Sequence, residues 1–98
     1  MKVNVALQII PITEAKNVYG IVDKAIEYIQ ASGILYKVTP FETVLEGELD
    51  EIFDIIKGAQ QACYNAGSDE LITNIKIQSS NSRDITIFEK MNKYESYK

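Results

Sequence analysis

The chain has 98 residues, a formal net charge of −4, 46% hydrophobic residues and 24% charged residues. These values are ordinary for one folded domain with a modest core, and they exclude the basic footprint of a nucleic-acid-binding protein. The sequence has no signal-peptide pattern and no apolar stretch that could span a bilayer, so we expect a cytoplasmic protein without a membrane partner.

The residue types also restrict the chemistry. The sequence has no histidine, and Cys63 is its only cysteine. An internal disulfide, a Ser-His-Asp triad and a Cys-His dyad are therefore excluded, and the usual zinc ligands are missing. Cys63 falls late in a helical pattern and is expected to be a small buried hydrophobe. We expect no metal site and no catalytic residue.

The first third of the chain predicts a strand followed by a helix. Residues 3–10 alternate between apolar and mixed positions, which indicates a strand that Pro11 ends. Thr13 can cap the following helix, whose apolar residues recur at helical spacing as far as Ile29. Ser32-Gly33 closes that helix.

The middle of the chain predicts an antiparallel hairpin. Residues 34–39 form one strand and residues 41–46 the next, with a bend at Pro40 between them. Thr43 and Glu46 bring hydrogen-bonding groups to a strand whose neighbours are apolar, which suits the wall of a polar pocket.

The last part of the chain predicts a helix, a strand and a short final helix. Gly47-Glu48 opens the helix, and its buried stripe runs from Leu49 to Cys63. A strand follows over residues 71–78, and Asp84 can cap the final helix.

This order of elements is β-α-β-β-α-β with one further helix, which is the ferredoxin-like plan. We predict one α+β domain over residues 1–98. Right-handed crossovers place both long helices on one face of a four-stranded antiparallel sheet.

The other face of this sheet is expected to be open. The helices should cover Val3, Val5, Leu7, Ile9, Thr73, Ile75 and Ile77. The open face then carries Asn4, Ala6, Gln8, Ile10, Ile72, Asn74, Lys76 and Gln78, joined by Phe41 and Leu45. A monomer would expose this mixed apolar surface, so we expect a homodimer or homotetramer that packs through its sheets.

Amide side chains on the open face are candidate ligand contacts. Gln8 and Asn74 each offer a donor and an acceptor, and between packed sheets they must pair with each other, with water or with a ligand. In the alternative interpretation they only bridge subunits or hold water. Lys76 is then a surface lysine with its stem on the sheet, and Tyr36 a core or interface residue.

Two motifs carry a family resemblance. Ser32-Gly33-Ile34-Leu35-Tyr36 and Thr43-Val44-Leu45-Glu46-Gly47 together resemble the thiamine-binding protein family, and the similarity extends from Val3 to the last helix. The resemblance implies a ferredoxin-like fold, association through the sheets, and thiamine or its hydroxymethylpyrimidine moiety as the ligand, with no further cofactor.

The resemblance also implies a site. Thr43 and Glu46 match the hairpin motif of the family, and Gln8 matches a polar position of its first strand. Together with Tyr36 and Asn74 they form the predicted ligand-binding set. Glu42 stands where many family members have glycine, so its side chain either narrows the pocket or points to solvent.

Three functions follow from these observations. The first is non-catalytic binding of thiamine or hydroxymethylpyrimidine at a pocket on the open face or at a subunit interface. Amide, hydroxyl and carboxylate groups complement an aminopyrimidine, and the scattered glycines form no phosphate cradle, which favours unphosphorylated thiamine. The alternatives are a small enzyme with Glu46 as acid or base, and a structural or regulatory oligomer without a physiological ligand.

Overall fold

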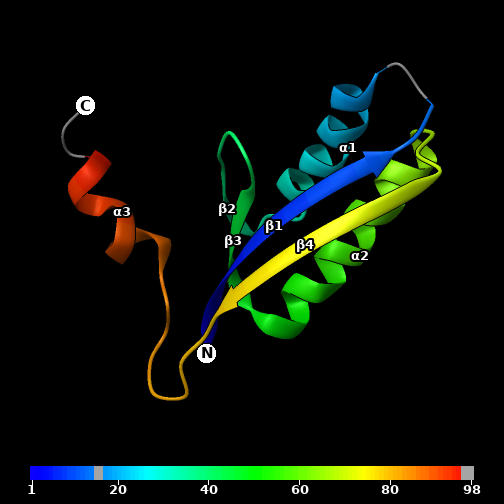
Figure 1. The fold of residues 1–98 in the computed structure, drawn as a ribbon. Coiled ribbons are helices and arrows are strands. Elements are labelled where there is room, and N and C mark those ends of the chain that lie inside the picture. Colours follow the sequence, from blue (N-terminus) through cyan, green and yellow to red (C-terminus); the bar gives the residue numbers. More distant parts are fainter. Residues whose placement is uncertain (15–16, 96–98) are drawn as a thin grey trace.

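The computed structural model describes residues 1–14 and 17–95. Its elements are β1 (Lys2–Ile12), α1 (Val18–Ala31), β2 (Leu35–Val38), β3 (Thr43–Glu48), α2 (Leu49–Asn65), β4 (Glu70–Gln78) and α3 (Ile87–Glu95). The strands form one antiparallel sheet in the order β2-β3-β1-β4, and α1 and α2 cover one of its faces (Figure 1). The predicted α+β fold is confirmed.

Strand β1 is longer than predicted, because it continues through Pro11 to Ile12. The last pair between β1 and β3 joins Leu7 to Thr43, whereas β4 accompanies β1 to its end and pairs Leu71 with Pro11. Pro11 therefore has a neighbouring strand on one side only, and such an edge position tolerates a residue without an N–H group. The prediction that Pro11 ends the strand was wrong.

Helix α1 begins at Val18, because Asn17 caps it. The Asn17 Oδ1 atom accepts a hydrogen bond of 2.9 Å from the Gly20 amide. This bond satisfies one of the backbone donors that a helix start leaves without a partner, so the prediction that Thr13 is the cap was wrong. The predicted helix end is confirmed, with Ser32 as C-cap and Gly33 at a φ of 80°.

The β2–β3 turn is closed by Thr39. Its Oγ1 donates to the Glu42 carbonyl oxygen at 2.6 Å and accepts from the Glu42 amide at 3.1 Å. Phe41 consequently lies at the tip of the turn and is 82% exposed, outside the strand in which it was predicted. Gly47 remains in β3 opposite Val3, so α2 begins later than predicted.

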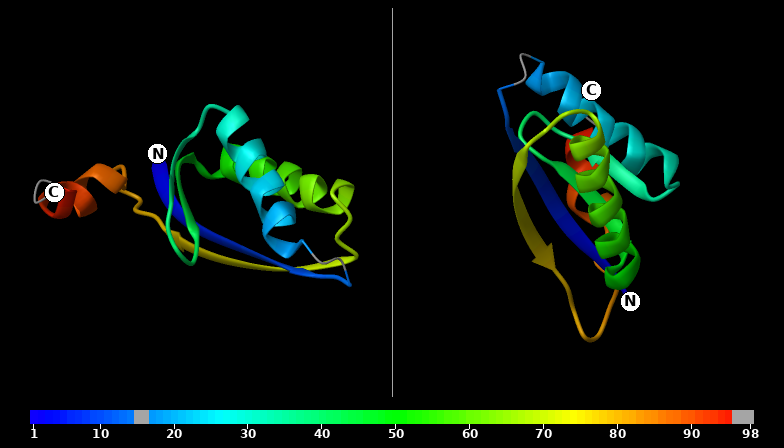
Figure 2. Two further views of the ribbon diagram at one scale, coloured as in Figure 1. Left: turned by 90° about the horizontal axis from the view of Figure 1, so that it is seen from above. Right: turned by 90° about the vertical axis from the view of Figure 1, so that its right-hand side faces the viewer.

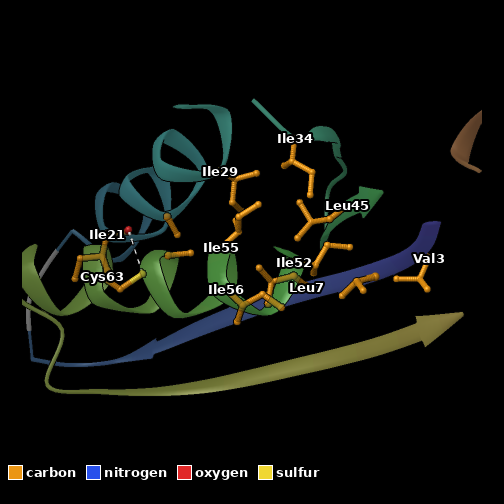
Figure 3. Close-up of a cluster of buried hydrophobic side chains, with 13 residues drawn as sticks. Val3, Leu7, Ile21, Ile29, Ile34, Leu45, Ile52, Ile55, Ile56 and Cys63 are labelled. Carbon is orange, nitrogen blue, oxygen red and sulfur yellow. Dashed lines mark hydrogen bonds between the residues drawn. The ribbon is translucent and has the colours of Figure 1, made fainter. Parts of the chain in front are cut away.

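The hydrophobic core lies between the sheet and the two long helices (Figure 3). Leu45 is fully buried in this core beside its strand partner Val5, so placing Leu45 on the open face was wrong. Cys63 is fully buried as predicted, and its Sγ donates to the Ile21 carbonyl oxygen at 3.7 Å. Burial raises the pKa of the Cys63 thiol, which keeps it protonated and unreactive.

The helices cover β1 but leave much of β4 uncovered. Thr73 contacts α2, because the Gln60 Nε2 atom donates a hydrogen bond to its hydroxyl at 2.9 Å. Ile75 and Ile77 are 37% and 45% exposed, although both were predicted to be covered. That prediction was wrong because β4 is the edge strand of the sheet.

Helix α3 stands away from the α/β body, beyond the end of the sheet where the N-terminus lies (Figures 1 and 2). Thr86 and Glu89 cap its start: the Thr86 amide donates to Glu89 Oε1 at 2.8 Å, and the Glu89 amide donates to Thr86 Oγ1 at 3.2 Å. Asp84, the predicted cap, instead accepts the Lys2 amide at 2.7 Å. The prediction for Asp84 was therefore wrong.

Within the described residues, no helix is long and apolar enough to cross a membrane, and no cluster of acidic or cysteine side chains is arranged to hold a metal ion.

Candidate functional site

Gln8 and Asn74 face each other on the open side of the sheet. They are direct partners in the β1–β4 register, and the Asn74 Nδ2 atom donates to Gln8 Oε1 at 3.3 Å. Each amide therefore has the other as its partner, which is one of the three pairings that the sequence left open.

Glu46 lies on the same face two rows of residues nearer the β1 start, opposite Asn4. Both side chains are buried, at 8% and 4% exposure. Glu46 Oε1 accepts the Ile87 amide at 2.5 Å, and Asn4 Nδ2 donates to the Ile85 carbonyl oxygen at 3.1 Å. These two hydrogen bonds attach the segment that leads into α3 to Glu46 and Asn4. Asn4 Oδ1 is enclosed and has no hydrogen-bond partner.

Thr43 and Tyr36 lie on the opposite, helix-covered face of the sheet. Thr43 is opposite Leu7 and 7% exposed, whereas Tyr36 is opposite Leu45 and packs against the core. The five predicted ligand residues are therefore divided between the two faces and do not converge on one cavity.

One cavity of about 360 Å³, which we call the hairpin groove, lies between α1, the end of β1 and the β2–β3 turn. Tyr19 and Phe41 are 86% and 82% exposed at its border, and Asp23 supplies a carboxylate. Its walls are mainly apolar, and Thr39 and Thr43 contribute hydroxyl groups. No basic residue lines this groove within the described part of the chain.

Two of the predicted residues border the hairpin groove. Thr43 lies at its wall, and Gln8 also borders it, although the Gln8 side chain is bonded to Asn74 on the other face. Sequence reasoning missed Tyr19 and Asp23. They are four residues apart on α1 and fall outside its buried stripe. This spacing is the sequence signal that could have indicated them.

A second cavity of about 350 Å³, which we call the lysine cavity, lies between the open face of the sheet and α3. Lys37, Lys76 and Lys90 line it, and no acidic residue does so within residues 1–14 and 17–95. Lys76 Nζ lies 3.4 Å from Glu42 Oε1, so the Glu42 side chain extends over the open face. The hairpin groove and the lysine cavity both have the volume of small-molecule sites.

Comparison with known proteins agrees with a small-molecule site. Residues 5–95 match the model of a family described as "Thiamine-binding protein". A UPF0045 protein of Clostridium perfringens is 40% identical over 91 residues, which cover 93% of this chain and 95% of that protein. A second UPF0045 protein, YqgV of Bacillus subtilis, is 36% identical over 88 residues and covers 85% of each chain.

Solved structures share the fold of this chain. A domain of unknown function, DUF77, from Bacillus cereus has a TM-score of 0.91 and 49% identity, and covers 96% of this chain and 90% of its own. A Thermotoga maritima protein, provisionally named for thiamine biosynthesis or salvage, has a TM-score of 0.86 and 32% identity, with 96% and 99% coverage. The chain therefore belongs to the thiamine-binding protein family.

Proposed function

We propose that this protein binds thiamine or its hydroxymethylpyrimidine moiety in the hairpin groove and does not turn the ligand over. The observation that carries the proposal is the chemistry of the groove border. Tyr19 and Phe41 present two exposed aromatic rings beside the Asp23 carboxylate, and no described basic residue lines the groove. The family match supports the same class of ligand.

The groove complements both rings of thiamine. The thiazolium ring is cationic, and a cation over an aromatic face gains about 0.5–2 kcal/mol, to which the Asp23 carboxylate adds attraction. The aminopyrimidine ring carries donors and acceptors that suit the hydroxyl of Thr43 and the backbone of the β2–β3 turn. Its apolar surface packs against Val18 and Val22, which also line the groove.

We further propose that the protein works as a cytoplasmic homodimer or homotetramer that packs through the open faces of its sheets, at the end of each face that lies away from α3. Ile10 and Ile72 are cross-strand partners at this end and are 39% and 47% exposed. Contact between two such faces removes this apolar surface from water. The hairpin groove lies on the helix-covered side of the sheet, so this packing leaves it open to ligand.

Isothermal titration of the whole chain tests the binding proposal. Thiamine and hydroxymethylpyrimidine should bind saturably, and a phenyl analogue of the pyrimidine should bind at least about tenfold more weakly, because it leaves polar groups without partners. Phe41→Ala and Asp23→Asn should each weaken thiamine binding by about 1 kcal/mol, or roughly fivefold.

Asn74→Ala is the matched control, because it removes a polar side chain from the other face of the sheet. It should leave thiamine affinity unchanged. If Asn74→Ala weakens binding while Phe41→Ala and Asp23→Asn do not, the ligand occupies the open face and the proposed location is wrong. Turnover of thiamine would instead show that the protein is an enzyme.

A further inference from the structure

The lysine cavity has a regular floor that the strand register defines. Lys37 pairs with Val44, Val44 with Ala6, and Ala6 with Lys76, so these four residues form one row across all four strands. The two small or apolar side chains lie in the middle, and a lysine stands at each end. The backbones of Lys37 and Lys76 are about 14 Å apart, which is three strand spacings. Two extended lysine side chains can therefore reach one group bound between them.

Helix α3 supplies the opposite wall of this cavity. Lys90 lines it from α3 together with the apolar side chains of Ile87 and Met91. Cationic groups from β2, β4 and α3 thus border one hollow. The protein has only 10 basic residues against 14 acidic ones, so three lysines at one cavity are a local concentration of basic groups, one of which, Lys76, is paired with Glu42 at 3.4 Å.

Asn4 also lines this cavity, one row away from the lysines. Its side chain is 4% exposed, and its Oδ1 has no hydrogen-bond partner, whereas its Nδ2 is bonded to Ile85. A buried acceptor without a partner is unfavourable, and a ligand N–H group would satisfy it. Asn4 Oδ1 is enclosed in this structure, so contact with a ligand donor requires a local movement of the chain around it.

We infer that the lysine cavity is a second small-molecule site, separate from the hairpin groove, and that it binds a phosphate monoester of an amino-substituted heterocycle. The phosphate lies over Ala6 and Val44 between the lysines, and a ring amino group about 7 Å along the strands donates to Asn4 Oδ1. The two cavities, on opposite faces of the sheet, then prefer ligands of opposite charge.

The experiment is an amide NMR titration of the whole protein with hydroxymethylpyrimidine phosphate, adenosine monophosphate and inorganic phosphate. The choice of the pyrimidine probe rests on the proposed function, whereas adenosine monophosphate does not depend on it. Both organic phosphates should shift the amide signals of Ala6, Lys76 and Lys90 and leave those of Tyr19 and Phe41 unchanged. Each should bind at least about tenfold more tightly than its dephosphorylated form, and less tightly as salt is raised.

Variants identify the groups responsible. The double variant Lys37→Gln/Lys76→Gln should weaken binding of both phosphates at least about tenfold, as expected when two charge-assisted contacts are lost. Lys57→Gln removes the same charge from the exposed face of α2, outside both cavities, and should change nothing. Asn4→Leu should weaken the organic phosphates and leave inorganic phosphate unaffected.

Equal affinity for phosphorylated and dephosphorylated forms would overturn the inference, as would unchanged binding in the double lysine variant or shifts confined to the hairpin groove. The outcome is separable from the proposed function. If adenosine monophosphate binds at the lysine cavity and thiamine binds nowhere, the second site stands and the proposed function fails. If thiamine binds at the hairpin groove and no phosphate binds at the lysine cavity, the reverse holds.

Discussion

Glu46 accepts the backbone amide of Ile87 at 2.5 Å and so fixes the start of α3 to the open face of the sheet. The two residues are separated by 41 positions in the sequence, and the carboxylate is 8% exposed. A buried carboxylate that accepts a backbone N–H forms a charge-assisted hydrogen bond. In this structure Glu46 therefore has a structural partner at the position where the family resemblance implied a ligand.

Loss of this bond should loosen α3. Glu46→Ala is expected to lower the free energy of local opening at Ile87 by about 1.5–3 kcal/mol, so hydrogen exchange at this amide should accelerate at least about tenfold. Glu46→Gln retains an uncharged acceptor and should have a smaller effect. Thiamine affinity should stay the same in both variants. A large loss of thiamine affinity in Glu46→Gln would instead show that Glu46 belongs to the ligand site.

The start of α3 should depend on pH through Glu89. The Thr86 backbone amide, followed by the Arg83 guanidinium, holds the pKa of the Glu89 carboxyl below its usual range. The group therefore stabilises the folded helix start above its unfolded pKa, and this contribution is lost as pH falls through the folded pKa. The protection factors for hydrogen exchange across residues 87–95, which correct for the slower intrinsic exchange in acid, should fall as the solution is acidified over this range.

Thr86→Ala provides the comparison for this acid effect. Removal of the capping hydroxyl should cost α3 about 0.5–2 kcal/mol of helix stability at neutral pH. Glu89→Gln should remove most of the pH dependence of the protection factors in α3. If the acid-induced change persists unaltered in Glu89→Gln, another group is responsible.

Close packing of α1 on α2 at Gly58 gives a stability prediction. A Cβ atom built on Gly58 would overlap the ring of Tyr28. Gly58→Ala should therefore lower the free energy of unfolding by about 1–3 kcal/mol, despite the better helix propensity of alanine. In a Tyr28→Ala background the same change should instead stabilise the protein by roughly 0.8–1 kcal/mol. Chemical denaturation of the wild type, the two single variants and the double variant measures these changes. If Gly58→Ala changes the free energy of unfolding with the same sign in both backgrounds, the prediction is contradicted.

Association through the open face predicts a response to charge. Ile72→Asp places a carboxylate in the proposed contact surface and should give smaller species in sedimentation velocity experiments. Tyr64→Asp, on α2 and 43% exposed, is the control and should leave the assembly intact. A wild-type protein that sediments as a monomer at micromolar concentration would refute the proposal.

The order of the elements and the alternation of the strands were predictable from the sequence, because both depend on local periodicity. The choice of cap was not. Thr13 and Asp84 are as capable of capping as Asn17 and Thr86, and the tertiary path of the chain decides between them. Leu45 shows a similar limit, because its contact with Val5 places it in the core and follows from register rather than from alternation.

The candidate site was less predictable than the fold. Residue types and the family resemblance grouped Gln8, Thr43 and Asn74, but the register separates Thr43 from the Gln8–Asn74 pair by the thickness of the sheet. The hairpin groove forms only where α1 passes the β2–β3 turn. The sequence contains its components, such as Tyr19 and Phe41, without the distance between them.

A crystal structure of the protein grown with thiamine is the most direct test of the central claim. We predict density for the ligand in the hairpin groove, with the thiazolium ring beside Tyr19 or Phe41 and the pyrimidine near Thr43. Density for thiamine on the open face beside Gln8 and Asn74, or no density at a thiamine concentration that saturates binding in solution, would contradict the proposed site.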